Sequence, residues 1–229
     1  MQYMDKHMEL EFYFGWLTDK LKQSREKTER TIIYCQPIRQ CGLLYASIKA
    51  LLGGYMFIGN DLNHVLVEML HSCTPEANKH NILESFQSDH GTICLLIAME
   101  AFGMGVDCEG VHRVIHFGPS KNMDSYVQET GRAGRDGHQS VAYVLYHGVM
   151  LNHMKPFIKT EECRRKTLLS LCPCIQNNPN FAVKIIVLLE ANVVCQTLIT
   201  LLNTQLSQDT RTLCQHLKKE KCCNCKRKL

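Results

Sequence analysis

The sequence has no long, uninterrupted apolar run and no secretory signal at its N-terminus. Its most apolar stretch, residues 181–202, is interrupted by Lys184, Glu190, Asn192 and Gln196. Because ionisable groups are costly in the middle of a bilayer, we expect a buried or amphipathic helix there and no membrane span. The lack of a secretory signal, together with thirteen cysteines, predicts a reducing compartment. Buried or metal-bound thiols are then favoured over disulfides.

What is present suits a folded protein. The chain has 229 residues, 45% of them hydrophobic, which is enough for one large domain or for one domain with an appendage. The net charge of +4 is uneven, because residues 211–229 carry seven Lys/Arg and one Glu, a local charge of +6 that leaves −2 for the rest. This basic tail could contact nucleic-acid phosphates without reading sequence, or it could be a solvated tail.

Short β-branched runs alternate with stretches of helical periodicity along the first 146 residues. Strands that are hydrophobic without alternation, separated by helices, indicate an α/β fold with a parallel sheet covered on both faces. One helix should begin with Thr74 as N-cap and Pro75 in its first turn, and turn Ile82, Leu83 and Phe86 inward. The expected strands are 31–35, 93–98, 111–117 and 140–146, and the other expected helices are 9–22, 39–52 and 123–131.

Two arginines lie among three glycines in the stretch QETGRAGRDG, residues 128–137. Read as a helix, Gln128, Arg132 and Arg135 fall at i, i+4 and i+7, so one face would present an amide and two guanidiniums to an anion. A guanidinium matches the oxygens of a phosphoryl group and can neutralise charge that develops during phosphoryl transfer. The alternative is a basic surface helix that ends in a Gly-rich turn.

A second glycine-rich stretch, AFGMGVD, occupies residues 101–107, directly after the strand expected at 93–98. Ligands of parallel sheets gather at the loops beyond the carboxyl ends of the strands, and these glycines would lie there. A simple tight turn is the alternative.

These stretches resemble known motifs. QETGRAGRDG resembles motif VI of RecQ-type superfamily 2 DNA helicases, and AFGMGVD resembles motif V of the same family at the expected distance upstream. IIYC, residues 32–35, resembles motif IV, and LHS, residues 70–72, lies where the family has a His-Ala-Gly turn. The resemblance runs from about residue 12 to residue 167 and resumes at the C-terminal cysteines.

The resemblance implies a fold class and a domain organisation. Residues 1–155 would form the second RecA-like domain of the helicase, a parallel sheet sandwiched by helices. Residues 156–229 would form a small helical zinc-binding lobe with a hydrophobic insertion at about 173–209.

The resemblance also implies an ATP-dependent helicase that moves 3′ to 5′ on DNA in the nucleus, with single strands and duplex junctions as partners and no membrane. Arg135 would be the arginine finger, and Arg132 and Gln128 would couple nucleotide to DNA. Gly105 and Asp107 would join Arg132 and Arg135 in the nucleotide site, with Asp107 near the ribose or its waters.

The phosphate loop of such an enzyme is absent from this sequence. There is no Gly-x-x-x-x-Gly-Lys-Ser/Thr and no Asp-Glu-x-His block, which would hold ATP and Mg²⁺ on a first RecA-like domain, normally in the same polypeptide. The chain alone is therefore expected to have negligible ATPase activity. The sequence also has Met99 and Glu100 where the family commonly has threonine and an aliphatic residue, and neither side chain replaces a hydroxyl bond to a DNA phosphate. A non-catalytic nucleic-acid-binding or interaction module is the alternative.

Several cysteines could bind Zn²⁺. Cys222 and Cys225 have the C-x-x-C spacing that lets two thiolates bind one tetrahedral Zn²⁺, and Cys163 and Cys214 would complete a Cys₄ site. The step from Cys214 to Cys222 is the one that the family uses. Rival ligands are Cys172, Cys174, Cys223 and His216. The alternative is a set of reduced cysteines on a basic tail.

Overall fold

Helices and strands alternate along most of the chain. A computed structural model describes residues 2–59, 61–99, 110–146, 154, 156–157 and 181–187. The described helices are α1 (Gln2–Ser24), α2 (Ile38–Leu52), α3 (Glu76–Gln87) and α4 (Met123–Thr130), with 3-10 turns η1 (Arg25–Lys27) and η2 (Gly53–Met56). The described strands are β1 (Arg30–Cys35), β2 (Phe57–Ile58), β3 (Asp61–Val65), β4 (Val67–Leu70), β5 (Leu95–Met99), β6 (Val111–Phe117), β7 (Ser140–Tyr146) and β8 (Phe181–Val187).

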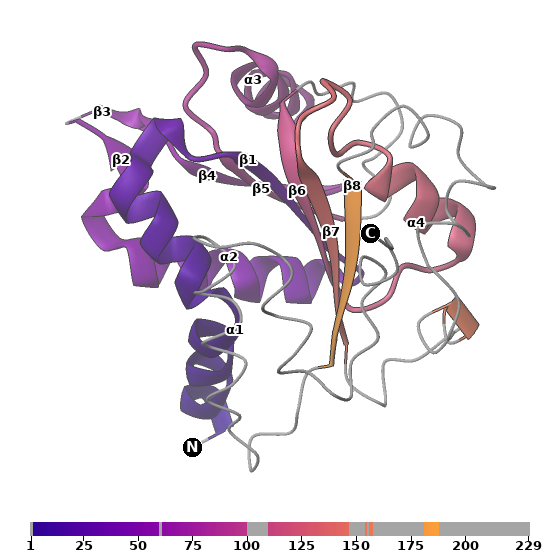
Figure 1. Cartoon of the computed structure of the whole chain (residues 1–229). Coiled ribbons are helices and arrows are strands. Elements are labelled where there is room, and N and C mark those ends of the chain that lie inside the picture. Colours follow the sequence, from indigo (N-terminus) through magenta and orange to yellow (C-terminus); the bar gives the residue numbers. More distant parts are fainter. Residues whose placement is uncertain are drawn as a thin grey trace.

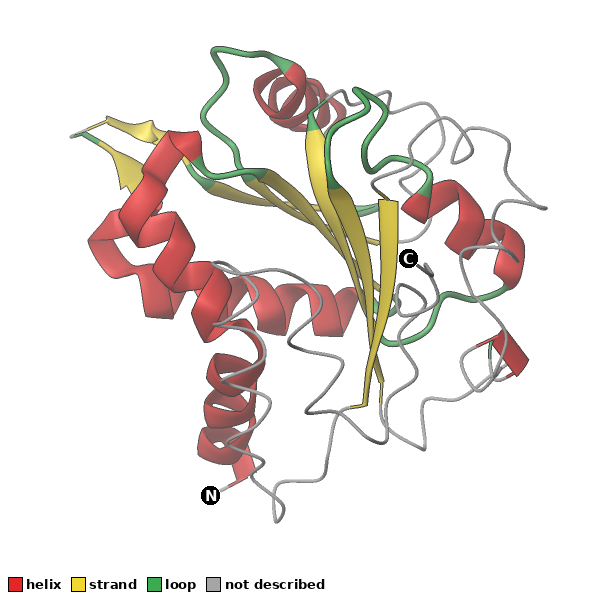
Figure 2. Cartoon of the chain, viewed as in Figure 1, coloured by secondary structure: helices red, strands yellow, loops and turns green. Residues whose placement is uncertain are grey.

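Six strands form one sheet in the order β4-β5-β1-β6-β7-β8, and every adjacent pair is parallel. In the register of this sheet, Ile33 of β1 is level with Ile97 of β5 and with Ile115 of β6. Strands β2 and β3 form a separate antiparallel hairpin, which projects at the upper left of Figure 1. Because parallel neighbours require crossover connections, the linking helices lie on the faces of the sheet, as Figure 2 shows.

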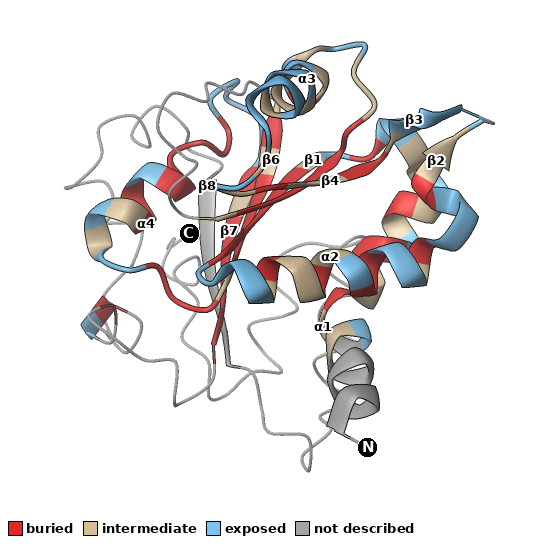
Figure 3. Cartoon of the chain, turned by 180° about the vertical axis from the view of Figure 1, so that it is seen from behind, coloured by how far each residue is buried: buried red, intermediate tan, exposed pale blue. Residues whose placement is uncertain are grey.

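Each face of the sheet carries its own apolar core. Leu17 of α1 and Leu44 of α2 pack with Ile33 on one face. On the other face, Tyr126 of α4 packs with Ile32, and α3 contributes to the same core. Figure 3 shows that β1, β6 and β7 of the large sheet are mainly buried and that the helices turn exposed surfaces outward. Complete burial of a leucine or isoleucine side chain stabilises the fold by roughly 2 kcal/mol relative to exposure.

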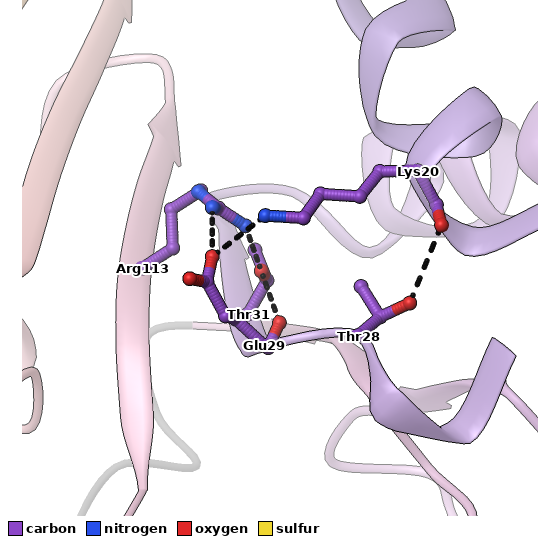
Figure 4. A network of polar contacts seen from close by, with 5 residues as sticks. All are labelled: Lys20, Thr28, Glu29, Thr31 and Arg113. Carbon is purple, nitrogen blue, oxygen red and sulfur yellow. Dashed lines mark hydrogen bonds and ion pairs between the residues drawn. The ribbon is translucent and has the colours of Figure 1, made fainter. Parts of the chain in front are cut away.

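A polar network fastens α1 to the sheet (Figure 4). Arg113 of β6 donates from Nη2 to Glu29 Oε2 at 2.5 Å and from Nη1 to Thr31 Oγ1 at 3.1 Å. Lys20 of α1 donates from Nζ to the same Glu29 oxygen at 2.8 Å. The Arg113 guanidinium also lies 5.3 Å from the centre of the Trp16 ring. The network therefore joins α1 to the first residues of β1 and β6.

Most of the elements expected from the sequence are confirmed. The expected parallel sheet with helices on both faces is present. Strands β6 and β7 have the predicted bounds, and β1 begins one residue before its predicted start. Helix α2 ends at Leu52 and is followed by its C-cap Gly53, whose φ of 54° suits glycine and few other residues.

The prediction of a helix over residues 181–202 is wrong for its first seven residues. Phe181–Val187 is a strand, β8, which pairs in parallel with β7 from Ser140 to Tyr146. The sequence FAVKIIV is rich in β-branched residues, and a short apolar run does not by its periodicity distinguish a strand from a buried helix. The open edge of β7 supplies backbone hydrogen-bond partners, and these stabilise residues 181–187 as a strand. The rest of the expected helix lies outside the described residues.

Two further details differ from the expectation. Thr74 does not cap α3, because its Oγ1 accepts a hydrogen bond from the His71 N–H at 3.1 Å and Pro75 occupies the N-cap position without a side-chain bond. Phe86 is buried as expected, and Ile82 and Leu83 pack against the same core. Strands β2, β3 and β4 were not predicted, because they are short and only β4 has buried residues at both ends.

None of the helices in the described ranges combines the length and the hydropathy that a membrane span requires. Four cysteines in these ranges are free thiols, namely Cys35, Cys41, Cys73 and Cys94.

Candidate functional site

Helix α4 carries the candidate site at its C-terminal end. The helix is capped by Asn122, whose Oδ1 accepts a hydrogen bond from the Ser125 N–H at 2.8 Å. Its inward face places Tyr126, Glu129 and Thr130 at i, i+3 and i+4, and all three are buried. The Tyr126 ring lies 4.8 Å from His116 of β6, measured between ring centres. The helix therefore packs against β6, an inner strand of the sheet.

The helix ends at Thr130, and residues 131–137, which we call the arginine turn, follow as a series of turns. Gly134 and Gly137 adopt φ values of 73° and 77°, which favour glycine. The Gly134 N–H donates to the Val111 carbonyl at 2.8 Å. This bond fixes the arginine turn beside the first residue of β6.

The helical interpretation of the two arginines is therefore wrong. Because α4 ends before them, Gln128, Arg132 and Arg135 do not share one helical face. Arg132 is only 6% exposed, whereas Gln128 and Arg135 are exposed. The Arg135 Nε donates to the Gly131 carbonyl at 3.1 Å, so local backbone orients its guanidinium at the surface. Arg135 is the arginine that an anion can reach without rearrangement of the chain.

The arginine turn lies beside Val111, four residues after the other glycine-rich stretch in the sequence. Gly105 and Asp107 lie outside the described residues, but the chain on either side of that stretch is described. Strand β5 ends at Met99, at the carboxyl ends of the parallel strands, and Gly110, with φ of 74°, directly precedes Val111 at the start of β6. Val111 accepts the hydrogen bond from Gly134, so the arginine turn lies beside the first residue of β6.

A histidine pair borders the arginine turn. His112 Nε2 lies 3.0 Å from Asp136 Oδ2, and the other carboxylate oxygen, Oδ1, accepts from the His138 N–H at 3.0 Å. The rings of His112 and His138 meet edge to face with centres 5.8 Å apart. Asp136, next to Arg135, is thereby tied to β6.

A buried polar group lies behind the arginine turn. Glu129 is 3% exposed and His116 is 1% exposed, and His116 Nε2 lies 2.8 Å from Glu129 Oε2. Ser120 Oγ donates to the same carboxylate oxygen at 2.8 Å. Reasoning from the sequence did not single out these residues. Helical spacing from Tyr126 to Glu129, combined with strand alternation from Val114 to His116, is the signal that could have found the pair.

The predicted zinc ligands Cys163, Cys214, Cys222 and Cys225 lie outside the described residues. Among the residues that are described, no three His, Cys, Asp or Glu side chains come together in a way that could hold a metal ion. The zinc site therefore stays a prediction.

The parallel sheet with helices on both faces and an arginine turn beside β6 defines an α/β protein with one exposed arginine, Arg135, in that turn. Residues 14–137 match the family described as helicase conserved C-terminal domain. This match spans more than half of the 229 residues and includes both glycine-rich stretches. The chain belongs to that family.

Curated relatives include both DNA and RNA helicases. ATP-dependent DNA helicase Q-like 5 of Arabidopsis thaliana is 43% identical over 84 residues, covering 37% of this chain and 9% of the relative. Bifunctional 3'-5' exonuclease/ATP-dependent helicase WRN of Mus musculus is 30% identical over 178 residues, covering 68% and 12%. Pre-mRNA-processing ATP-dependent RNA helicase PRP5 of Kluyveromyces lactis is 27% identical over 172 residues, covering 75% and 19%. The chain thus corresponds to a small part of each relative.

A solved structure has the same fold. The structure titled Mss116p DEAD-box helicase domain 2 bound to an RNA duplex superposes with a TM-score of 0.53 at 11% identity. The superposition covers 89% of this chain and 66% of that chain. At this identity the likeness concerns the fold alone.

Proposed function

We propose that this chain is the C-terminal half of a RecQ-type, ATP-dependent DNA helicase that moves 3′ to 5′. Membership of the helicase C-terminal domain family supports the general class. The RecQ-type assignment is supported by the sequences of residues 101–107 and 128–137 and by the similarity to the Q-like helicase of Arabidopsis thaliana. The partners would be single-stranded DNA, duplex junctions and a first RecA-like domain, and the protein would work in the nucleus.

The arginine turn carries the proposal. Arg135 is exposed, its Nε is oriented by the Gly131 carbonyl, and the turn is bonded to Val111 at the start of β6. A guanidinium held in this way can neutralise the charge that develops on a transferring phosphoryl group. Gly105 and Asp107 would approach the same nucleotide from the neighbouring stretch.

The other two residues of the proposed site would have supporting roles. Gln128 is exposed two residues before the end of α4, and we assign it to the coupling of nucleotide with DNA. Arg132 is 6% exposed, so its coupling role would pass through the arrangement of the turn around it. The phosphates and Mg²⁺ would be held mainly by the first RecA-like domain.

A reconstitution tests the proposal. The chain is joined in cis to the first RecA-like domain of a relative, and ATP hydrolysis is measured with and without single-stranded DNA. We expect hydrolysis that DNA stimulates, and a loss of about a thousandfold in kcat with Arg135→Ala, since arginine fingers contribute on that scale. The control is Lys49→Ala, which removes an exposed cation from α2 and should leave kcat within about twofold.

Two outcomes would redirect the proposal. Stimulation by RNA and not by DNA would make the chain part of an RNA helicase, a class also present among its relatives. No hydrolysis with a first domain that is active beside its own second domain would favour a non-catalytic module. The observation that favours such a module is that Met99 and Glu100 stand where the family commonly has threonine and an aliphatic residue.

A further inference from the structure

Glu129 is a buried carboxylate to which the proposed function gives no role. It is 3% exposed, and burial of a carboxylate is costly unless hydrogen bonds and charges compensate it. Its side chain is held by His116 Nε2 and Ser120 Oγ, both 2.8 Å from the single oxygen Oε2. The carboxylate therefore joins three segments, namely α4, β6 and the loop between them.

The support behind this carboxylate is rigid. His116 belongs to β6, which pairs with β1 on one side and β7 on the other. Its ring stacks on Tyr34 of β1 with centres 5.5 Å apart and contacts Tyr126 of α4. An imidazole enclosed in this way keeps one orientation, so Glu129 is anchored to the centre of the sheet.

The backbone of Glu129 extends the anchor into the arginine turn. Its carbonyl accepts hydrogen bonds from the Arg132 N–H at 3.3 Å and from the Gly131 N–H. The Gly131 carbonyl in turn accepts from Arg135 Nε at 3.1 Å. A continuous set of bonds thus leads from the buried Glu129 side chain to the exposed guanidinium of Arg135.

We infer that Glu129, held by His116 and Ser120, is a positioning residue for Arg135. It acts through the backbone of the arginine turn and touches neither nucleotide nor DNA. The inference rests on the proposed function, in which Arg135 faces the nucleotide. Small displacements of such a group cost rate because the transition state demands its charge at one place.

The first test uses the whole chain alone and needs no activity. Exchange of the Arg135 Nε–H and of the Arg132 amide with solvent is followed by NMR in the native chain and in Ser120→Ala. Loss of one hydrogen bond to a carboxylate should speed both exchanges by about tenfold. Asp124→Asn, which changes an exposed carboxylate at the other end of α4, is the control and should leave both rates unchanged.

The second test uses the reconstituted enzyme. Ser120→Ala should lower kcat about tenfold and leave KM for ATP within about twofold, since positioning of an arginine finger acts in the transition state. In an Arg135→Ala background the same substitution should cause no further loss, because its effect passes through Arg135. Glu129→Gln, which retains an acceptor oxygen, should keep most of the kcat that Glu129→Ala loses.

The outcomes separate the two proposals. Unchanged exchange of the Arg135 Nε–H in Ser120→Ala would overturn the positioning role, whatever the enzyme does. Additive losses from Ser120→Ala and Arg135→Ala would overturn it as well. Changed exchange in a chain that never supports hydrolysis would instead keep the anchor and refute the helicase function.

Discussion

At the scale of single residues, Arg113 shows how this fold accommodates a charge inside. Its side chain is buried, and it would be destabilising there without a partner. Glu29 supplies the opposite charge at 2.5 Å, and the Trp16 ring supplies a polarisable surface. Half-burial raises the pKa of Glu29, but the hydrogen bond from Lys20 and the charge of Arg113 outweigh it and hold this pKa below its ordinary value of 4.5.

This lowered pKa predicts a dependence of stability on pH. The folded state binds the Glu29 proton less tightly than the unfolded state, so the ionised carboxylate stabilises the fold above pH 4.5. The contribution is lost as the pH falls through the folded pKa. We expect Glu29→Gln to lower the free energy of unfolding by about 1 kcal/mol at pH 7. The difference from the native chain should shrink below pH 4.5, as followed by urea unfolding at a series of pH values.

A matched substitution separates this network from a general effect of charge. Glu84→Gln removes an exposed carboxylate from α3 and should change the free energy of unfolding by less than about 0.5 kcal/mol at pH 7. A difference between Glu29→Gln and the native chain that grows as the solution is acidified would contradict the network.

At the scale of an element, α4 is a short helix that depends on its ends and on one face. It has eight residues, too few to be stable alone in water. Asn122 satisfies the N–H of Ser125 at its start, and Asp124 places a negative charge in the first turn, where the helix dipole favours it. Packing of Tyr126 on the sheet supplies the rest. The start of α4 is therefore a stability determinant distant from the arginine turn.

Substitution at Asn122 tests this dependence. We expect Asn122→Ala to lower the free energy of unfolding by about 1 kcal/mol, because it removes the acceptor for the Ser125 N–H. Asn122→Ser keeps an acceptor and should stay within about 0.5 kcal/mol of the native chain. Both values come from chemical unfolding monitored by the single tryptophan, Trp16. Equal losses in the two variants would mean that the cap is not what stabilises the start of the helix.

At the scale of the whole molecule, the fold brings the arginine turn beside Val111, the first residue of β6, although the rest of β6 and all of α4 lie between them in the sequence. Strand β6 is itself held between β1 and β7. Two layers of helices hold the strands between them. The position of the site thus depends on the packing of the entire α/β layer.

Zinc binding is the other prediction at this scale. We propose that Cys163, Cys214, Cys222 and Cys225 hold one Zn²⁺, whose attachment would contribute folding energy to the C-terminal part of the chain. The chain purified without chelator should contain about one zinc per molecule by atomic absorption. Cys222→Ser and Cys225→Ser should lose it. Cys73→Ser, which changes an exposed free thiol, should retain it, and an equal zinc content in all these variants would refute the assignment.

The sequence by itself determined the features that depend on neighbours along the chain. The β-branched runs of β1, β6 and β7 and the helical periodicity of α2 and α4 were correctly predicted, because strand and helix preferences act within a few residues. Gly53 marked the end of α2 because few other residues adopt its φ. The amino-acid sequences of residues 101–107 and 128–137 indicated the family.

The tertiary structure alone decided what depends on contacts between distant segments. Whether Phe181–Val187 became a helix or a strand depended on the open edge of β7, since a strand requires a partner for its hydrogen bonds. Helical spacing predicted the two arginines on one face. The bond from Gly134 to Val111 and the packing around Arg132 instead set them in different environments. Glu129 acquired its anchor only because folding brings His116 and Ser120 to the same carboxylate oxygen.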